Sequence, residues 1–296
     1  MFAGKRRTIE DYSIDLICYF LLFIMVFVTL YPFYFIVINS LNEGMDAARG
    51  GIYLWPRRFT FENYAEFFND PKWMDALFVT AARTIIGTPL TVFFTCMVAY
   101  GLSHKNLMFK KTYFILFVFS MYFSGGLVTY FVVLRSLGLL NNFLVYIIPW
   151  ALNTFFLFVA TAFFRDLPQE MIESGYIDGA GDMKIYFRIV IPVSMPLIAT
   201  MLLFIGVTQW NSWFDAAYFV RYDHLKTLGY RMIEVINQSL APADAQAALL
   251  LAGSRRITPL SLQMAAMIVA TAPIIFVYPF LQKHFIKGMM LGSVKG

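Results

Sequence analysis

The stretch RDLPQEMIESGYIDGAGDMKIYFRIVIP, residues 165–192, follows a long apolar run at 136–164 and overlaps the start of another at 189–214. It carries too many charges to remain in a bilayer, because each charge at membrane depth is costly. Its large apolar residues nevertheless recur at helical spacing. They are Met171, Ile172, Tyr176 and Ile177. We predict a short amphipathic helix, a turn and a second helix that project from a membrane-embedded protein.

Apolar runs of membrane-spanning length occur throughout the chain. Hydrophobic residues make up 59% and charged residues 14%, against roughly 25% charged in soluble domains. About 20 apolar residues cross a bilayer as a helix, and helices satisfy their own backbone groups there. Six runs lack any charged residue: 16–41, 84–103, 112–134, 136–164, 189–214 and 257–282. We predict an all-α integral membrane protein with six transmembrane helices, the second beginning near Asp75 and the fourth near Asn142.

Other residues argue against several alternative classes of protein. The net charge of +5 comes from scattered basic residues, which does not favour nucleic-acid binding. Cys18 and Cys96 lie in apolar runs and are expected to be buried thiols. The three histidines lie far apart, so we expect neither a metal nor a catalytic residue. The first apolar run, 26 residues long, exceeds the roughly 7–15 of a signal peptide and is predicted to be a retained span.

The basic residues near the span ends favour a cytoplasmic N-terminus. Twelve of the 23 Lys and Arg residues fall in the inner segments of that topology. The short 103–111 loop decides the orientation, because the rule weakens in long loops. We predict a cytoplasmic N-terminus at 1–15, a transmembrane domain at 16–282 and a cytoplasmic tail at 283–296. The inner loop is 165–192, and the outer loops are 42–74 and 215–256.

Helix-breaking residues interrupt several of the apolar runs. Gly125 and Gly126 lie in the middle of the third run. Such breaks fit either helices bent around a translocation path or ordinary proline use in membranes. The prolines in or at the ends of runs are Pro32, Pro89, Pro149, Pro196, Pro273 and Pro279.

Within the 165–192 stretch, cap and turn residues define two helices. Asp166 is expected to cap the first helix, with Pro168 in its first turn and Gln169 completing a capping box. Gly175 and Gly179 are four residues apart and predict a strip without side chains, where another backbone approaches closely. Asp182 is expected to cap the second helix.

The same stretch resembles the signature of ABC importer permeases, a Glu-Ala-Ala…Gly motif that ends in Leu-Pro. The residues of this chain have the same spacing as the family motif. Where they differ from it, one small residue replaces another or one apolar residue replaces another. The matching segments are Glu173-Ser174-Gly175, Asp178-Gly179-Ala180 and Ile191-Pro192. This resemblance implies the type I, maltose-permease-like fold, with a cytoplasmic coupling helix.

Five further segments resemble the carbohydrate-uptake branch of this family. LGLLNN at 137–142, WNSWFD at 210–215 and QKHFIKG at 282–288 are similar to elements of that branch. GIYLWP at 51–56 and FSGGL at 123–127 are similar to the subgroup for oligosaccharide and uronide uptake. The resemblance implies half of a translocation pathway for a carbohydrate in a bacterial cytoplasmic membrane.

The resemblance also implies the partners of the chain. They are a second permease subunit (usually a different chain), two ATP-binding subunits and an extracytoplasmic solute-binding protein. The chain has no phosphate-binding G-x-x-x-x-G-K-[ST] loop, so ATP and Mg²⁺ would be bound by the partner ATPase and this chain is not itself an enzyme. The expected ATPase-coupling residues are Glu173, Ser174, Gly175, Asp178, Gly179, Ala180, Ile191 and Pro192. The 241–253 run of small residues would reach into the binding protein.

Candidates for the substrate path are aromatic and amide side chains, which bind sugars through ring faces and hydrogen bonds. They are Asn153, Gln209, Trp210, Asn211 and Trp213. For the tryptophans, the favoured alternative is an interfacial aromatic belt. Asp215 is expected outside the hydrocarbon as a helix cap. Arg83 is expected to extend outward to water or to pair with Asp75.

Two other functions are compatible with parts of this pattern. A permease for another solute, such as an amino acid or phosphate, would share the 165–192 stretch and lack only the carbohydrate-like segments. A membrane enzyme would need acidic or histidine clusters at the lipid boundary, and the only acidic cluster, 170–182, lies in the inner loop.

Overall fold

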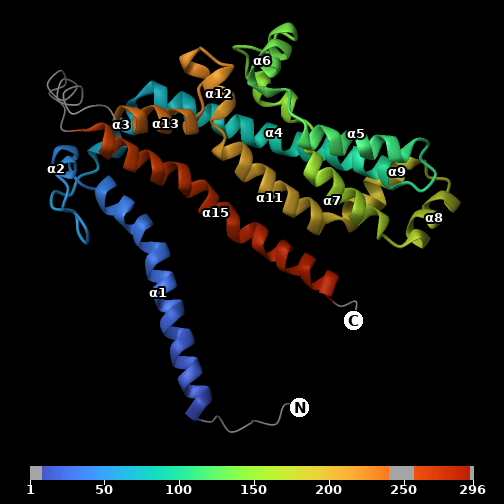
Figure 1. Cartoon of the computed structure of the whole chain (residues 1–296), viewed down its shortest axis with the longest axis horizontal. Helices are drawn as coiled ribbons and strands as arrows, with labels where there is room; N and C mark the ends of the chain where they lie inside the picture. The colour runs from blue at the N-terminus through green and yellow to red at the C-terminus, as the bar shows by residue number, and fades with distance from the viewer. Residues whose placement is uncertain (1–8, 240–256, 294–296) are drawn as a thin grey trace. The chain divides into compact units, whose positions relative to one another are not determined.

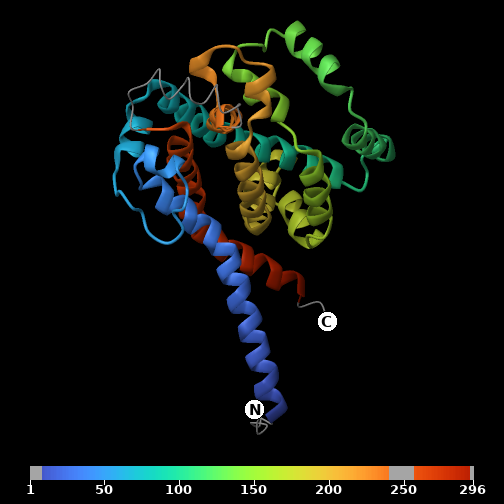
Figure 2. The same cartoon turned by 60° about the vertical axis from the view of Figure 1, so that its left-hand side comes forward.

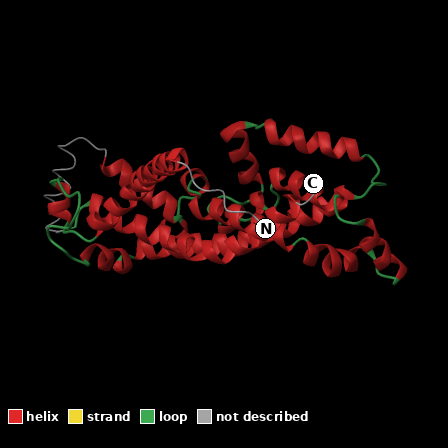
Figure 3. Cartoon of the chain, turned by 90° about the horizontal axis from the view of Figure 1, so that it is seen from below, coloured by secondary structure: helices red, strands yellow, loops and turns green. Residues whose placement is uncertain are grey.

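The computed structural model describes residues 9–239 and 257–293, and within these ranges every regular element is a helix (Figure 3). Four helices are long and apolar enough to cross a membrane. Two further pairs of helices are bent, and counting each pair as one span gives six. The predicted all-α architecture is therefore confirmed, and the predicted six spans are obtained when each bent pair is one span. The described residues form two compact units, Met1–Asn69 with Val235–Val269, and Asp70–Glu234 with Ala270–Gly296.

The first unit contains α1 (Ile9–Ser40), α2 (Gly44–Ala48) and α3 (Glu62–Asn69). Most side chains of α1 are exposed and apolar along its length, as expected for a helix in lipid. Cys18 is among them, so the expected burial holds only for Cys96. The loop after α1 is organised by Asn63, whose amide donates to the Ser40 and Asn42 carbonyls at 2.8 Å each.

The second unit is built on α4 (Pro71–Ser103), which packs against α7 (Thr154–Arg165) and α11 (Met195–Asn211) (Figure 1). The α4 helix begins earlier than expected. The Asp70 side chain accepts a hydrogen bond from the Lys72 N–H, and Pro71 occupies the first turn, a position where proline costs no helical hydrogen bond. The core between these helices includes Cys96, Leu157, Ala160, Phe164 and Met201.

The third predicted span is broken at its glycine pair. The α5 helix (Lys110–Tyr122) and the α6 helix (Gly126–Ser136) meet at 114°, the sharp corner on the right of Figure 2. Gly126 has a φ of 77°, which glycine adopts without steric cost. A continuous third helix is thus replaced by two shorter ones.

The fourth predicted span is also segmented, with a bend of 40°. It starts at Asn142, as expected, because the Asn142 side chain accepts from the Leu144 N–H at 2.9 Å. Two short 3₁₀ helices, η1 (Phe143–Tyr146) and η2 (Ile148–Trp150), then lead to α7. Pro149 lies in the second of them.

The remaining elements follow the 165–192 stretch. This stretch forms α8 (Gln169–Ile177), α9 (Asp182–Ile185), the π-helix η3 (Tyr186–Val190) and α10 (Ile191–Val193), which lead into α11. Short helices α12 (Phe214–Tyr218) and η4 (Asp223–Leu225) precede α13 (Leu228–Ser239). The last helix is α15 (Pro259–Ser293), which contains Pro273 and Pro279.

Candidate functional site

The α8 helix is the central element of the 165–192 stretch. The helix–turn–helix expected there is present, but its caps differ from the prediction. Asp166 ends α7, and α8 begins after Pro168 without a side-chain cap. Asp182 is the first residue of α9, and its carboxylate accepts a hydrogen bond from the Tyr176 hydroxyl instead. This bond closes the turn between α8 and α9, and it raises the pKa of Tyr176.

The two glycines of this stretch have different surroundings. Gly175 is buried, and a Cβ placed on it would lie 3.0 Å from Ile189 Cδ1 and 3.1 Å from Ile185 Cγ1. Gly179 has a φ of 74° with nothing within 4 Å of its Cβ position. The close approach expected along a strip from Gly175 to Gly179 is therefore made, at Gly175, by the chain's own α9 and η3.

The remaining residues expected to couple to an ATPase lie on α8, in the turn that follows it and in α10. Glu173, Ser174 and Asp178 are exposed, and Ile177 is 86% exposed. An isoleucine this exposed at a helix end favours contact with a partner, because apolar area gains free energy on burial. Ala180 and Ile191 are half-buried against the core of the second unit, and Pro192 is exposed.

A buried polar cluster joins α4 to the end of α11 and to α12. Arg83 donates from Nε to Gln209 Oε1 and from Nη2 to Asp215 Oδ2, both at 2.6 Å. The Trp150 indole donates to the same carboxylate oxygen at 3.0 Å, and the guanidinium lies 4.9 Å from the centre of the Tyr146 ring. A buried charge needs such a partner set, because isolated charges are strongly disfavoured away from water.

This cluster overturns two expectations. Arg83 is fully buried, so it neither extends to water nor pairs with Asp75. Asp215 is buried within the helical bundle rather than capping a helix in water. The cluster is not fully satisfied, since Arg83 Nη1 and Gln209 Nε2 have no hydrogen-bond partner within the described part of the chain.

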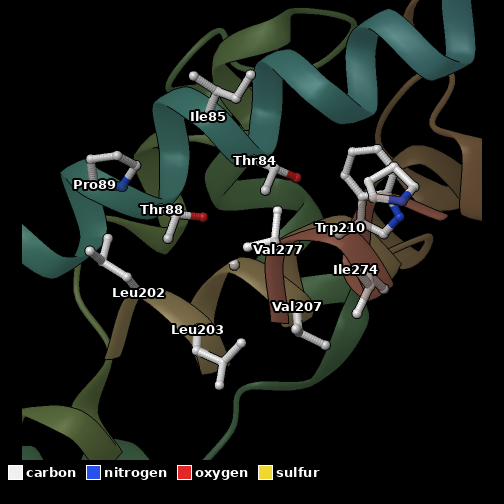
Figure 4. A pocket seen from close by; sticks show the side chains of 12 residues that line it. Thr84, Ile85, Thr88, Pro89, Leu202, Leu203, Val207, Trp210, Ile274 and Val277 are labelled. Carbon is white, nitrogen blue, oxygen red and sulfur yellow. The ribbon is translucent and has the colours of Figure 1, made fainter. Parts of the chain in front are cut away.

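An apolar cavity of about 530 Å³ lies beside this cluster, between α4, α11 and the Ala270–Ser293 part of α15 (Figure 4). Thr84 and Thr88 supply hydroxyl groups to its wall, and aliphatic side chains supply most of the rest. Trp210 forms one end of the cavity, and its indole donates to the Ala270 carbonyl at 2.9 Å. A cavity with so few polar groups suits an apolar group better than a bare sugar.

The predicted substrate-path residues do not converge on one place. Gln209 joins the polar cluster and Trp210 lines the cavity, whereas Asn211 is exposed at the end of α11. Asn153 caps α7 by accepting from the Phe156 N–H at 3.0 Å. Trp213 is 39% exposed and packs edge-on against the Phe214 ring. The expected binding-protein contact at 241–253 lies outside the described residues.

The chain matches a family model described as "binding-protein-dependent transport system inner membrane component" over residues 63–291. The chain belongs to this family. The match covers the second to sixth spans together with the α8 segment. The protein is therefore an inner-membrane transport component and not an enzyme.

Individual relatives support the family assignment. Protein LplC of Bacillus subtilis is 36% identical over 91% of this chain and 90% of its own length. The polygalacturonan/rhamnogalacturonan transport system permease protein YtcP of the same organism is 35% identical, covering 95% and 98% respectively. A bacterial ABC transporter involved in the import of the acidic polysaccharide alginate contains a chain of similar structure. That chain has a TM-score of 0.85 and 26% identity, over 95% of this chain and 100% of its own length.

Proposed function

We propose that this chain is a permease subunit of an ATP-driven importer and forms half of the translocation pathway for an oligosaccharide or uronide-type glycan. The observation that carries the proposal is similarity along nearly the whole chain to YtcP and to the alginate importer chain. YtcP is named for polygalacturonan/rhamnogalacturonan transport, and the alginate importer takes up an acidic polysaccharide. The carbohydrate-like segments of the sequence point to the same substrate class.

Energy for transport would come from other subunits. The proposed assembly contains a second permease subunit (a different chain), two ATP-binding subunits that hold ATP and Mg²⁺, and an extracytoplasmic binding protein. Both termini of this chain would be cytoplasmic, which places α8 on the side of the ATPase. The exposed Glu173 and Ile177 on α8 supply one charged and one apolar contact for a groove in that subunit.

The coupling role is tested by substituting one residue of α8 in the assembled, reconstituted importer. Glu173→Ala should abolish uptake and binding-protein-stimulated ATP hydrolysis while the subunit remains in the membrane. Gly179→Asp should do the same, because an L-residue is strained at a φ of 74°. Glu170→Ala is the matched control, since Glu170 is an exposed acid on the same helix. Normal stimulated ATPase activity in Glu173→Ala would contradict the coupling role.

The substrate class is tested separately with the unmodified importer. Uptake of trigalacturonate into cells or proteoliposomes should be saturable and dependent on ATP and the binding protein. An amino acid and phosphate serve as comparison solutes. Transport of either comparison solute instead of the sugar would assign the chain to another branch of the family.

A further inference from the structure

A second, polar pocket lies at the junction of α6 and α12, within the second unit. Its volume is about 290 Å³, and it is separate from the apolar cavity. Arg135, in the last turn of α6, and Arg221, just after α12, both contribute to its wall. Asn141, Tyr218 and Phe219 are also part of the lining. We call it the two-arginine pocket.

Two hydrogen bonds fix the geometry of this pocket. The Asn141 N–H donates to the Phe219 carbonyl at 3.0 Å, and Asn141 Oδ1 accepts from the Arg221 N–H at 2.6 Å. Asn141 has a φ of 56°, a left-handed conformation that asparagine tolerates better than most residues. The Phe219 ring is buried against Tyr130 and Phe131. The segments that carry the two arginines are therefore joined before any ligand arrives.

The positive charge of the pocket is not compensated by any residue that the structure describes. Neither Arg135 nor Arg221 forms an ion pair with any residue in 9–239 or 257–293, whereas Arg57, Arg58, Arg83 and Arg231 each do. The acid nearest in sequence to Arg221, Asp223, is already shared by Lys72 at 3.8 Å and Arg231 at 3.4 Å. The α6 dipole favours a cation at Arg135, but it does not explain a second arginine from another segment.

We propose that the two-arginine pocket binds a carboxylate-bearing sugar residue of the transported oligosaccharide, an assignment that rests on the proposed function. Guanidinium groups match a carboxylate through paired N–H donors. The Tyr218 side chain, 48% exposed, offers an aromatic face for a sugar ring. A volume near the lower end of small-molecule sites fits one sugar unit of a longer chain. In the predicted topology, the pocket opens on the outer side.

The test is direct binding of trigalacturonate to the purified, assembled transporter without its binding protein, measured by saturation-transfer NMR titration. The fully methyl-esterified trisaccharide is the neutral comparison probe. Arg135→Gln/Arg221→Gln should weaken trigalacturonate binding about tenfold, equivalent to about 1.4 kcal/mol, and leave binding of the ester unchanged. The conservative Arg135→Lys/Arg221→Lys variant should have an affinity for trigalacturonate between those of the unmodified and the glutamine variants, because lysine keeps the charge without the paired donors. Arg49→Gln, at another exposed arginine, should have no effect.

Three outcomes would overturn the assignment. They are no detectable trigalacturonate binding to the unmodified transporter, an unchanged affinity in the double glutamine variant, and an equal loss for acidic and esterified probes. A defect seen only in stimulation by the binding protein would instead show that the arginines dock an acidic surface of that protein. If the unmodified importer transports trigalacturonate but the double variant binds it normally, only the pocket fails. If it transports none, the proposed function fails as well.

Discussion

Neutralising Asp215 should destabilise the second unit strongly, because it leaves the Arg83 charge buried without a counter-ion. Arg83 has no solvent exposure, and its 2.6 Å bond to Asp215 is its only ion pair among the described residues. Removing one partner of a buried ion pair costs about 3–5 kcal/mol. A change of 1 kcal/mol shifts the melting temperature by about 2–4 °C in proteins of comparable size. Asp215→Asn should therefore lower it by roughly 6–20 °C.

Thermal unfolding of the purified chain in detergent, followed by the loss of the monodisperse chromatographic peak, measures this change. The Arg83→Met/Asp215→Asn double variant should recover most of the loss, since no buried charge remains and the asparagine oxygen still accepts from Trp150. Asp223→Asn is the control: the Asp223 side chain is exposed, its pair with Lys72 lies at the surface, and the buried Arg231 keeps its 2.8 Å ion pair with Glu234. This substitution should change the free energy of unfolding by less than about 1 kcal/mol. An unaltered melting temperature in Asp215→Asn, or losses that simply add in the double variant, would refute the reasoning.

The remaining predictions concern the α8 segment and use the same unfolding measurement. Gly175→Val should lower the free energy of unfolding by about 1–3 kcal/mol, because the added side chain would overpack against Ile185 of α9 and Ile189 of η3. Gly179→Ala should lower the free energy of unfolding by about 1–2 kcal/mol, because the only cost is the strain of an L-residue in the left-handed conformation. Equal losses of stability in the two variants would contradict the different surroundings of these glycines. The hydrogen bond to Asp182 raises the pKa of Tyr176 in the folded protein. The contribution of this bond to the free energy of unfolding is therefore complete below pH about 10, the ordinary tyrosine pKa. It is lost as the pH rises through the folded-state pKa. Tyr176→Phe should remove this alkaline dependence, and an unchanged pH profile would contradict it.

The membrane helices were predictable because their cause is local. A long run of apolar residues without charge has one stable backbone arrangement in a bilayer, and all six such runs correspond to helices or bent helix pairs. The bend after α5 was also indicated by the sequence, since Gly125 and Gly126 interrupt the third run. The size of the bend was not predictable, because it depends on how α5 and α6 pack against other parts of the fold.

The polar cluster was missed because its cause is not local. Arg83 and Asp215 are separated by 132 positions, and each lies at the boundary of a charge-free run when the sequence is considered alone. A charge at such a boundary is expected to face water. Pairing across helices removes that requirement, and α4 extends with Arg83 inside its buried face. The absence of charge is therefore a sufficient criterion for a span here, but not a necessary one.

The α11 helix physically links the α8 segment to the buried polar cluster around Arg83. On the coupling role proposed for α8, a displacement begins at Gly175, which packs on Ile185 and Ile189 before α10 and α11. The 17-residue α11 helix is roughly 25 Å long, and its last turns carry Gln209, which is bonded to Arg83 of α4. Since α4 and α11 also pack along their lengths, they should move as one body. The bending should then concentrate in η3, where the π-helix already departs from regular α-helical bonding.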